Sequence, residues 1–86
     1  MAKGIQDARY KRLIEALAAA RRKAGLNQTE LAERLGKRQQ FVSKYESGER
    51  RLDFVEVLDV AKALGIPVET LTRDIGEFGS GHLGTE

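Results

Sequence analysis

The segment from Gln28 to Gly48 places the strongest constraint on the fold, because it reads as two short helices joined at a glycine. Apolar residues recur at three- and four-residue steps on each side of Gly36, which is the period of an amphipathic helix. Gly36 fits the junction, since a left-handed backbone costs glycine little. The small residue Ala32 lets the two helices cross closely. Two helices joined by so short a turn predict a helix-turn-helix over residues 28–47.

Three further helices are expected around this pair. The predicted helical segments span residues 7–24, 28–35, 38–47, 54–64 and 68–75. Asp53 fits the N-cap of the fourth helix, with Glu56 three residues later to complete a capping box. This helix is expected to bury a stripe that includes Phe54 and to turn Val60 away from the core. Because no segment alternates like a strand, the predicted fold class is all-α, with five short helices around one core.

The chain has the length of one domain, since 86 residues cannot support two separate cores. Residues 1–75 are expected to form that domain. Residues 76–86 include four glycines in eleven positions, and such a segment cannot offset the entropy of ordering without partners. We therefore expect a disordered, flexible C-terminal tail.

Composition argues against several classes of protein. The chain has no Cys, so it has neither a disulfide framework nor a Cys-based zinc site. Its longest apolar run, Ala16 to Ala20, is far shorter than the ~18 residues of a membrane span, so we expect a cytoplasmic protein without a membrane partner. No Ser/His/Asp set falls on one rigid pocket, and His82 stands alone in the tail. We accordingly expect no enzymatic activity, no cofactor and no metal.

Charge is distributed unevenly along the chain, although the net charge is only +2. Residues 1–51 carry a net charge of +7, and residues 52–86 carry −5. Such a division suggests that one surface faces a polyanion while another faces away from it. The alternative is an ordinary solvated surface with a chance asymmetry.

The second helix of the central pair exposes a face whose chemistry suits DNA. In a helix-turn-helix this helix lies in the major groove, and here Gln40, Lys44 and Ser47 point opposite the inward Val42. Gln can pair with adenine N6 and N7, Lys can donate to guanine O6 and N7, and an apolar ring can pack on a thymine methyl. The candidate base contacts are Gln39, Gln40, Phe41, Ser43 and Lys44. Without the surrounding motif, the same residues would read as solvated surface.

Residues suited to phosphate flank this helix on both sides. The candidate phosphate contacts are Gln28, Lys37, Arg38, Arg50 and Arg51. Cations beside a groove suit phosphate oxygens, and Gln28 begins a helix, where backbone amides bind phosphate. The three cations at 21–23 fit either the dipole at the end of the first helix or a contact with DNA.

The sequence resembles the lambda-repressor-like family, also called the Cro or XRE type of helix-turn-helix. The matching words are Gly25-Leu-Asn-Gln-Thr-Glu-Leu-Ala32, Leu35-Gly36, Val42-Ser-Lys-Tyr-Glu-Ser-Gly-Glu-Arg50, Leu58 and Ala61-Lys-Ala-Leu-Gly65. The resemblance runs from residue 13 to residue 71. It implies a five-helix DNA-binding domain in which Gln28 touches a phosphate and supports the second helix of the motif. It also implies base contacts from Gln39, Gln40 and Lys44, and a structural pair between Glu46 and Arg50.

Together these features predict a sequence-specific DNA-binding transcriptional regulator. We expect a repressor that binds a palindromic operator in double-stranded DNA as a homodimer. Val55 and Val60 are expected to project from the fourth helix and to form the dimer surface with Leu71 and Phe78. Two alternatives remain open. One is a protein-interaction module, such as an antitoxin that holds a toxin or another regulator, and the other is a helical adaptor without DNA affinity.

Overall fold

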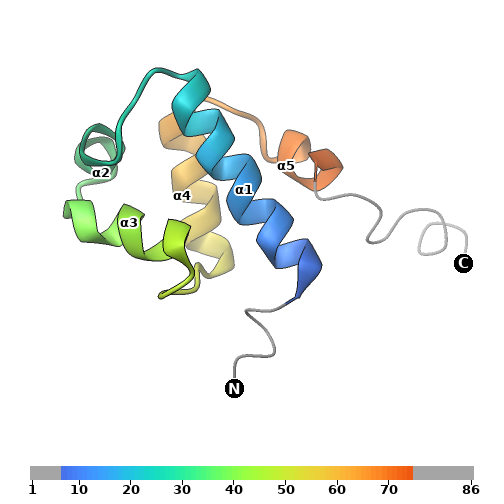
Figure 1. Ribbon diagram of the computed structural model, residues 1–86. Coiled ribbons are helices and arrows are strands. Elements are labelled where there is room, and N and C mark those ends of the chain that lie inside the picture. The colour runs from blue at the N-terminus through green and yellow to red at the C-terminus, as the bar shows by residue number, and fades with distance from the viewer. Residues whose placement is uncertain (1–6, 75–86) are drawn as a thin grey trace, which may run out of the picture.

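The computed structural model describes residues 7–74, and all regular structure in this part is α-helical (Figure 1). The helices are α1 (Ala8–Lys23), α2 (Gln28–Leu35), α3 (Gln39–Ser47), α4 (Phe54–Leu64) and α5 (Val68–Asp74). The predicted all-α class with five helices is confirmed, and the helix boundaries within residues 7–74 lie within one residue of their predictions. The predicted end of the fifth helix, at residue 75, lies outside the described residues. The tail predicted for residues 76–86 lies outside the described residues. Within residues 7–74, none of the helices combines the length and apolar character needed to cross a bilayer.

Local capping explains why the helices begin and end where they do. The side chain of Asn27 accepts a hydrogen bond from the backbone N–H of Glu30, and the carboxylate of Glu30 accepts one from the backbone N–H of Asn27, both at 2.8 Å. Asp53 and Glu56 form the same reciprocal box at the start of α4. Gly36 ends α2 with a φ of 68°, the left-handed conformation that favours glycine. These contacts are local, which is why sequence patterns located the helix ends.

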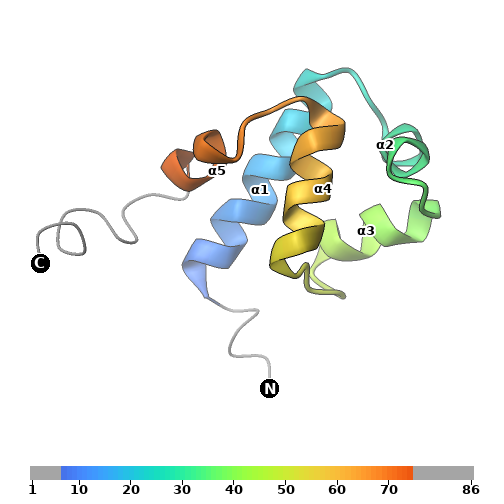
Figure 2. The same cartoon turned by 180° about the vertical axis from the view of Figure 1, so that it is seen from behind.

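α1 and α4 lie side by side at the centre of the molecule, with α2 and α3 on one side and α5 on the other (Figures 1 and 2). α2 packs on α3 and on α4, and α5 packs on α1. The largest side chains without exposed surface are Leu17, Leu31, Val42, Tyr45 and Val60. Since they come from α1, α2, α3 and α4, one core fixes the helix-turn-helix pair to the rest of the domain.

The structure corrects several side-chain assignments on α4 and α5. Val60 was expected to project outward but is fully buried, and Leu71 is only 2% exposed, so neither projects from the surface as a contact residue. Phe54 was expected in the core but is 70% exposed. α4 contacts both α1 and α2, which buries more of its middle than a single stripe, while Phe54 precedes the packed part. Val55 is exposed as expected, and Phe78 lies outside the described residues.

Candidate nucleic-acid interface

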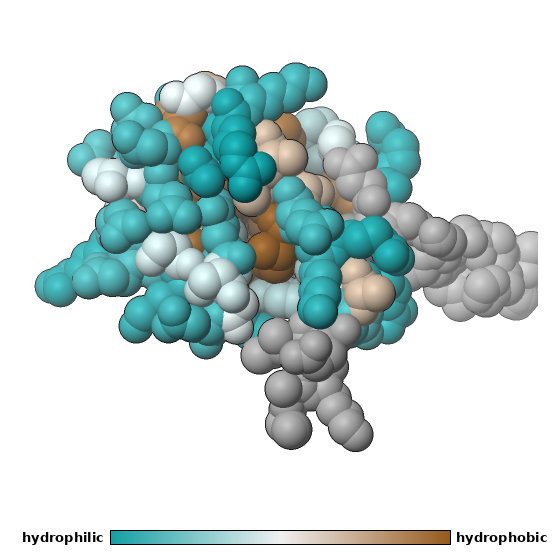
Figure 3. Space-filling model, in the orientation of Figure 1, coloured by the Kyte–Doolittle hydropathy of each residue, from teal (hydrophilic) through white to brown (hydrophobic). Residues whose placement is uncertain are grey.

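α3 lies at the surface, with one side fixed to the core and the other open to solvent. Val42 and Tyr45 anchor the inner side. The outer side carries Gln39, Gln40, Ser43 and Lys44, which we call the reading face. Ser43 is half-buried, and the other three side chains are exposed. The surface over α2 and α3, at the left of Figure 3, is largely hydrophilic, so α3 presents polar groups on a rigid support.

A chain of hydrogen bonds holds Gln39 in place from behind. The side-chain amide of Gln39 donates to Gln28 Oε1 at 3.0 Å, and the amide of Gln28 donates to Glu46 Oε1 at 2.9 Å. Glu46 in turn accepts hydrogen bonds from Arg21 Nε at 2.8 Å and from Arg21 Nη2 at 3.1 Å. These four residues, which we call the brace, connect the end of α1 to the start of α3. The resemblance implied that Gln28 supports the second helix of the motif, α3, which we call the reading helix, and this geometry agrees.

The ion pair at the end of the brace is nearly enclosed. The side chains of Arg21 and Glu46 are 11% and 9% exposed. Burial raises the pKa of Glu46, but the hydrogen bonds from Arg21 and Gln28 outweigh it, so that the pKa lies below its ordinary value. Glu46 is therefore a carboxylate in the folded protein. The sequence carried no sign of this contact, because Arg21 lies 25 residues before Glu46.

The expected pair between Glu46 and Arg50 is wrong. Arg50 instead donates two hydrogen bonds to the Glu56 carboxylate, at 2.7 and 3.0 Å, and one to the backbone carbonyl of Arg51. Each of the two residues has a nearer partner: Glu46 faces α1, while Arg50 lies in the loop that leads to α4. Arg50 therefore ties this loop to the first turn of α4, and its guanidinium is less free to meet a phosphate than the sequence suggested.

Phe41 lies beside α4 rather than on the reading face. It packs against the core, with its ring 5.6 Å from the ring of Tyr45 in an edge-to-face arrangement. The Lys37 ammonium lies 5.3 Å from the centre of the Phe41 ring, and the Arg50 guanidinium lies 4.9 Å from it. Cations are attracted to the face of an aromatic ring. The structure thus gives Phe41 a half-buried, supporting position between two cations.

The predicted phosphate contacts fall into two groups. Lys37 and Arg38 are exposed immediately before α3, and Arg38 is its N-cap residue without a side-chain capping bond. Arg51 is exposed, but its guanidinium lies 4.3 Å from the centre of the Tyr10 ring, on the side of α1. Lys37 and Arg38 are therefore the cations that adjoin the start of the reading helix.

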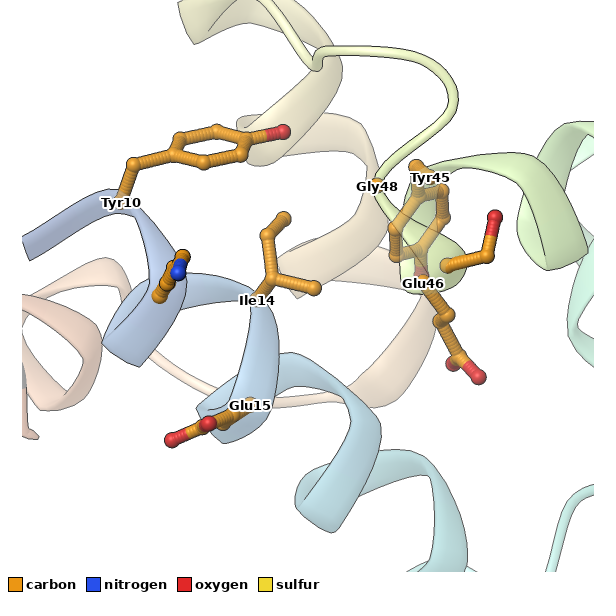
Figure 4. A pocket seen from close by; sticks show the side chains of 8 residues that line it. Tyr10, Ile14, Glu15, Tyr45, Glu46 and Gly48 are labelled. Carbon is orange, nitrogen blue, oxygen red and sulfur yellow. The ribbon is translucent and has the colours of Figure 1, made fainter. Parts of the chain in front are cut away.

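A cleft of about 360 Å³ lies between α1 and the end of α3 (Figure 4). Its walls include Tyr10, Ile14, Tyr45 and Glu46. The Tyr45 hydroxyl is buried without a hydrogen-bond partner, and it is the one buried side-chain nitrogen or oxygen of the described residues in that state. Burial raises the pKa of Tyr45, so the phenol stays neutral. The ring of Tyr45 therefore anchors α3 by apolar packing, and its hydroxyl adds no bond.

The fold and the exposed polar face of α3 define a helix-turn-helix module, in which a short helix is presented at the surface by the helix before it. Comparison with known families agrees, because the family model described as "Helix-turn-helix" matches residues 17–71. The chain belongs to this family, in its Cro/C1 or XRE type, whose members are DNA-binding transcriptional regulators.

Two individual relatives support this assignment. A solved structure described as an XRE-family like protein from Pseudomonas syringae pv. tomato str. DC3000 is 44% identical, with a TM-score of 0.77, and the match covers 86% of this chain and 90% of that one. A protein of Rhodospirillum rubrum described as an "Uncharacterized transcriptional regulator in ATPase CF(0) region" is 36% identical over 59 residues, which is 69% of this chain. The match spans 55% of that relative's length.

Proposed function

We propose that this chain is a sequence-specific transcriptional repressor that binds a palindromic operator as a homodimer, with α3 in the major groove. One observation carries the proposal: Gln40 and Lys44 are exposed side by side on α3, while Val42 and Tyr45 fix the opposite side of the helix. A helix held in this way can present the same side chains to a base edge at each encounter. Such pre-organisation lowers the entropy cost of binding.

The chemistry of the reading face suits base edges. Gln40 can bond adenine N6 and N7 together, and Lys44 can donate to guanine O6 and N7. Gln39 sits in the first turn of α3, the end that contacts bases in this motif. Because its amide already donates to Gln28, Gln39 meets DNA in a defined orientation. Ser43 adds a hydroxyl between these side chains.

Phosphate contacts come from the starts of α3 and α2. Lys37 and Arg38 supply positive charge next to the start of α3, and Gln28, whose side-chain amide bonds Glu46 and Gln39, supplies its backbone N–H at the start of α2. These contacts position the protein on the duplex and add affinity that falls with salt, without choosing a sequence. Arg50 serves mainly to hold the loop before α4, since Glu56 takes its guanidinium.

We propose a homodimer because the α3 helix of a single copy contacts too few base pairs to specify an operator. A single α3 contacts few base pairs, whereas two copies on a palindrome double the contacts when their half-sites lie ~34 Å apart. Binding of the second copy then adds its affinity to that of the first. A palindrome with half-sites about 10 bp apart is the expected product of sequence selection.

Selection of bound duplexes from a random pool, followed by affinity measurements on the selected site, tests this function. Gln40→Ala and Lys44→Ala should each weaken specific binding by about 1–3 kcal/mol and relax the sequence preference at one position. Lys62→Ala, which removes an exposed cation from the last turn of α4, is the matched control for Lys44. Failure to enrich any sequence would overturn the proposal. If Gln40→Ala and Lys44→Ala both bound the selected site as tightly as the wild type, residues other than this face of α3 would make the base contacts.

A further inference from the structure

An apolar groove of about 250 Å³ lies between α1, the start of α4 and α5. The apolar side chains that line it include Leu13, Leu52, Phe54, Val57, Val68 and Leu71. Asp53 and Thr72 are the lining residues with polar side chains other than the phenol of Tyr10. A recess of this composition is typical of a site that receives an apolar group.

Two large apolar side chains stand exposed beside this groove. Phe54 is 70% exposed and Val55 is 62% exposed, and within residues 7–74 they are the large hydrophobic side chains that are most open to solvent. A single exposed apolar residue needs no explanation. Here Phe54 lines an apolar groove and Val55 is its neighbour along α4, and such a combination marks an interaction surface.

The rim of the groove also carries both signs of charge. The Arg51 guanidinium lies over the ring of Tyr10, which forms one wall, and Asp53 lines the groove two residues further along the chain. Both side chains are exposed. In a dimer with a two-fold axis, if one residue of the first copy contacts a second residue of the other copy, the same contact occurs with the two copies exchanged. Opposite charges at one rim therefore make this face complementary to a copy of itself.

From these observations we infer that the groove receives the Phe54 side chain of a second copy of this chain, and that the exchange is reciprocal. Arg51 of each copy then faces Asp53 of the other, while Val55 packs at the edge of the contact. The inference rests on the proposed homodimer, and it replaces Val60 and Leu71 as exposed contact residues. Tyr10 lines both this groove and the cleft at the end of α3, so the interface adjoins that cleft.

Self-association without DNA gives the first test, by sedimentation equilibrium of the full chain. Phe54→Asp should weaken dimerisation at least tenfold, because a carboxylate would have to enter an apolar groove. Ala19→Asp, which adds the same charge at an exposed position of α1, should leave dimerisation unchanged. Circular dichroism checks that both variants fold. A Phe54→Asp variant that dimerises as strongly as the wild type would overturn the interface, and so would a wild type that stays monomeric at the highest soluble concentration.

Cross-linking gives a second test that keeps the Phe54 side chain in place. The chain has no Cys, so Val55→Cys, at the edge of the proposed contact, and Ala19→Cys each introduce the only thiol. A short bismaleimide should link two Val55→Cys chains and leave Ala19→Cys chains unlinked. Equal linking of both variants would count against the proposed face.

DNA binding separates the interface from the function on which it rests. Phe54→Asp should bind a single half-site as well as the wild type does, and should lose at least tenfold in affinity for the full palindrome. Equal loss on the half-site and the palindrome would contradict the interface. If the wild type enriched no duplex from the random pool, the proposed function would be wrong. The measurement of self-association without DNA would still test the groove in that case.

Discussion

The reading face and the apolar groove differ in how they are prepared for a partner. On the reading face, polar side chains are exposed, and the brace fixes Gln39 from behind through Gln28 and Glu46. In the groove, Phe54 is exposed and apolar. Hydrogen bonds to base edges depend on direction, so orientation before binding is useful there. Apolar burial has no direction, so Phe54 can meet a partner without comparable support.

This difference implies that the two surfaces respond differently to substitution. A change in the brace should alter both the stability of the fold and the reading of DNA, because the same atoms serve both. A change at Phe54 should alter association alone, since its exposed ring contributes little to the core. The following variants examine this distinction, beginning with the largest expected effect.

Glu46→Ala should have the largest effect on stability. It would leave the Arg21 guanidinium, whose side chain is 11% exposed, without its carboxylate. Loss of one partner from a buried pair costs about 3 kcal/mol in the free energy of unfolding, and chemical denaturation measures this. The variant should also lose base-specific affinity, because Gln28 would no longer be held. Glu49→Ala, at an exposed position nearby, should change stability by less than ~0.5 kcal/mol. If both variants were equally stable, the brace would have no energetic role.

Glu56 should give the fold part of its resistance to acid. The hydrogen bond from Arg50 lowers the pKa of Glu56 from 4.5 to about 2. Since the folded pKa lies below the unfolded one, the stabilisation is complete above about pH 4.5 and is lost as the pH falls toward 2.

Glu56→Gln tests this by thermal unfolding between pH 6 and pH 3. The variant should be about 1 kcal/mol less stable at pH 6, and the gap should narrow as the solution becomes more acidic. Glu49→Gln is the control at an exposed site. A gap that stays constant with pH would show that the Arg50 bridge does not depend on the charge of Glu56.

Tyr45→Phe should have the smallest effect, with stability unchanged or higher by up to ~1 kcal/mol. Its hydroxyl is buried without a partner, and removal of an unsatisfied polar group carries no loss. Tyr10→Phe is the matched comparison, because the Tyr10 hydroxyl accepts a hydrogen bond from the backbone N–H of Leu52 at 3.1 Å. That variant should lose about 1 kcal/mol. Urea denaturation measures the free energy of unfolding of both variants. If Tyr45→Phe lost more stability than Tyr10→Phe, the assigned contacts would be wrong.

Helix positions could be predicted because the signals that set them are local. Asn27 and Glu30 are three residues apart, as are Asp53 and Glu56, and each pair satisfies the backbone of its own helix. Gly36 needs only its own freedom of conformation to end α2. The polar side of α3 could be predicted in the same way, since periodicity alone separates Gln40 from Val42.

Contacts between distant segments could not be predicted in this way. The resemblance to the family implied a pair between Glu46 and Arg50, four residues away, whereas the structure pairs Glu46 with Arg21 on another helix. The single apolar stripe drawn for α4 also failed at Val60, which is buried because α4 packs on both α1 and α2. Exposure of an apolar residue at a helix start, as at Phe54, depends on whether a neighbouring element reaches it.

The sequence alone determined the five helices, the turn at Gly36 and the polar side of the reading helix, since these depend on capping, backbone freedom and periodicity within a few residues. The tertiary structure alone decided that Gln39 is held through Gln28 and Glu46, and that an apolar groove opens beside Phe54. Both features arise where separate helices meet. The relative placement of helices depends on the packing of the whole core, which no short pattern encodes.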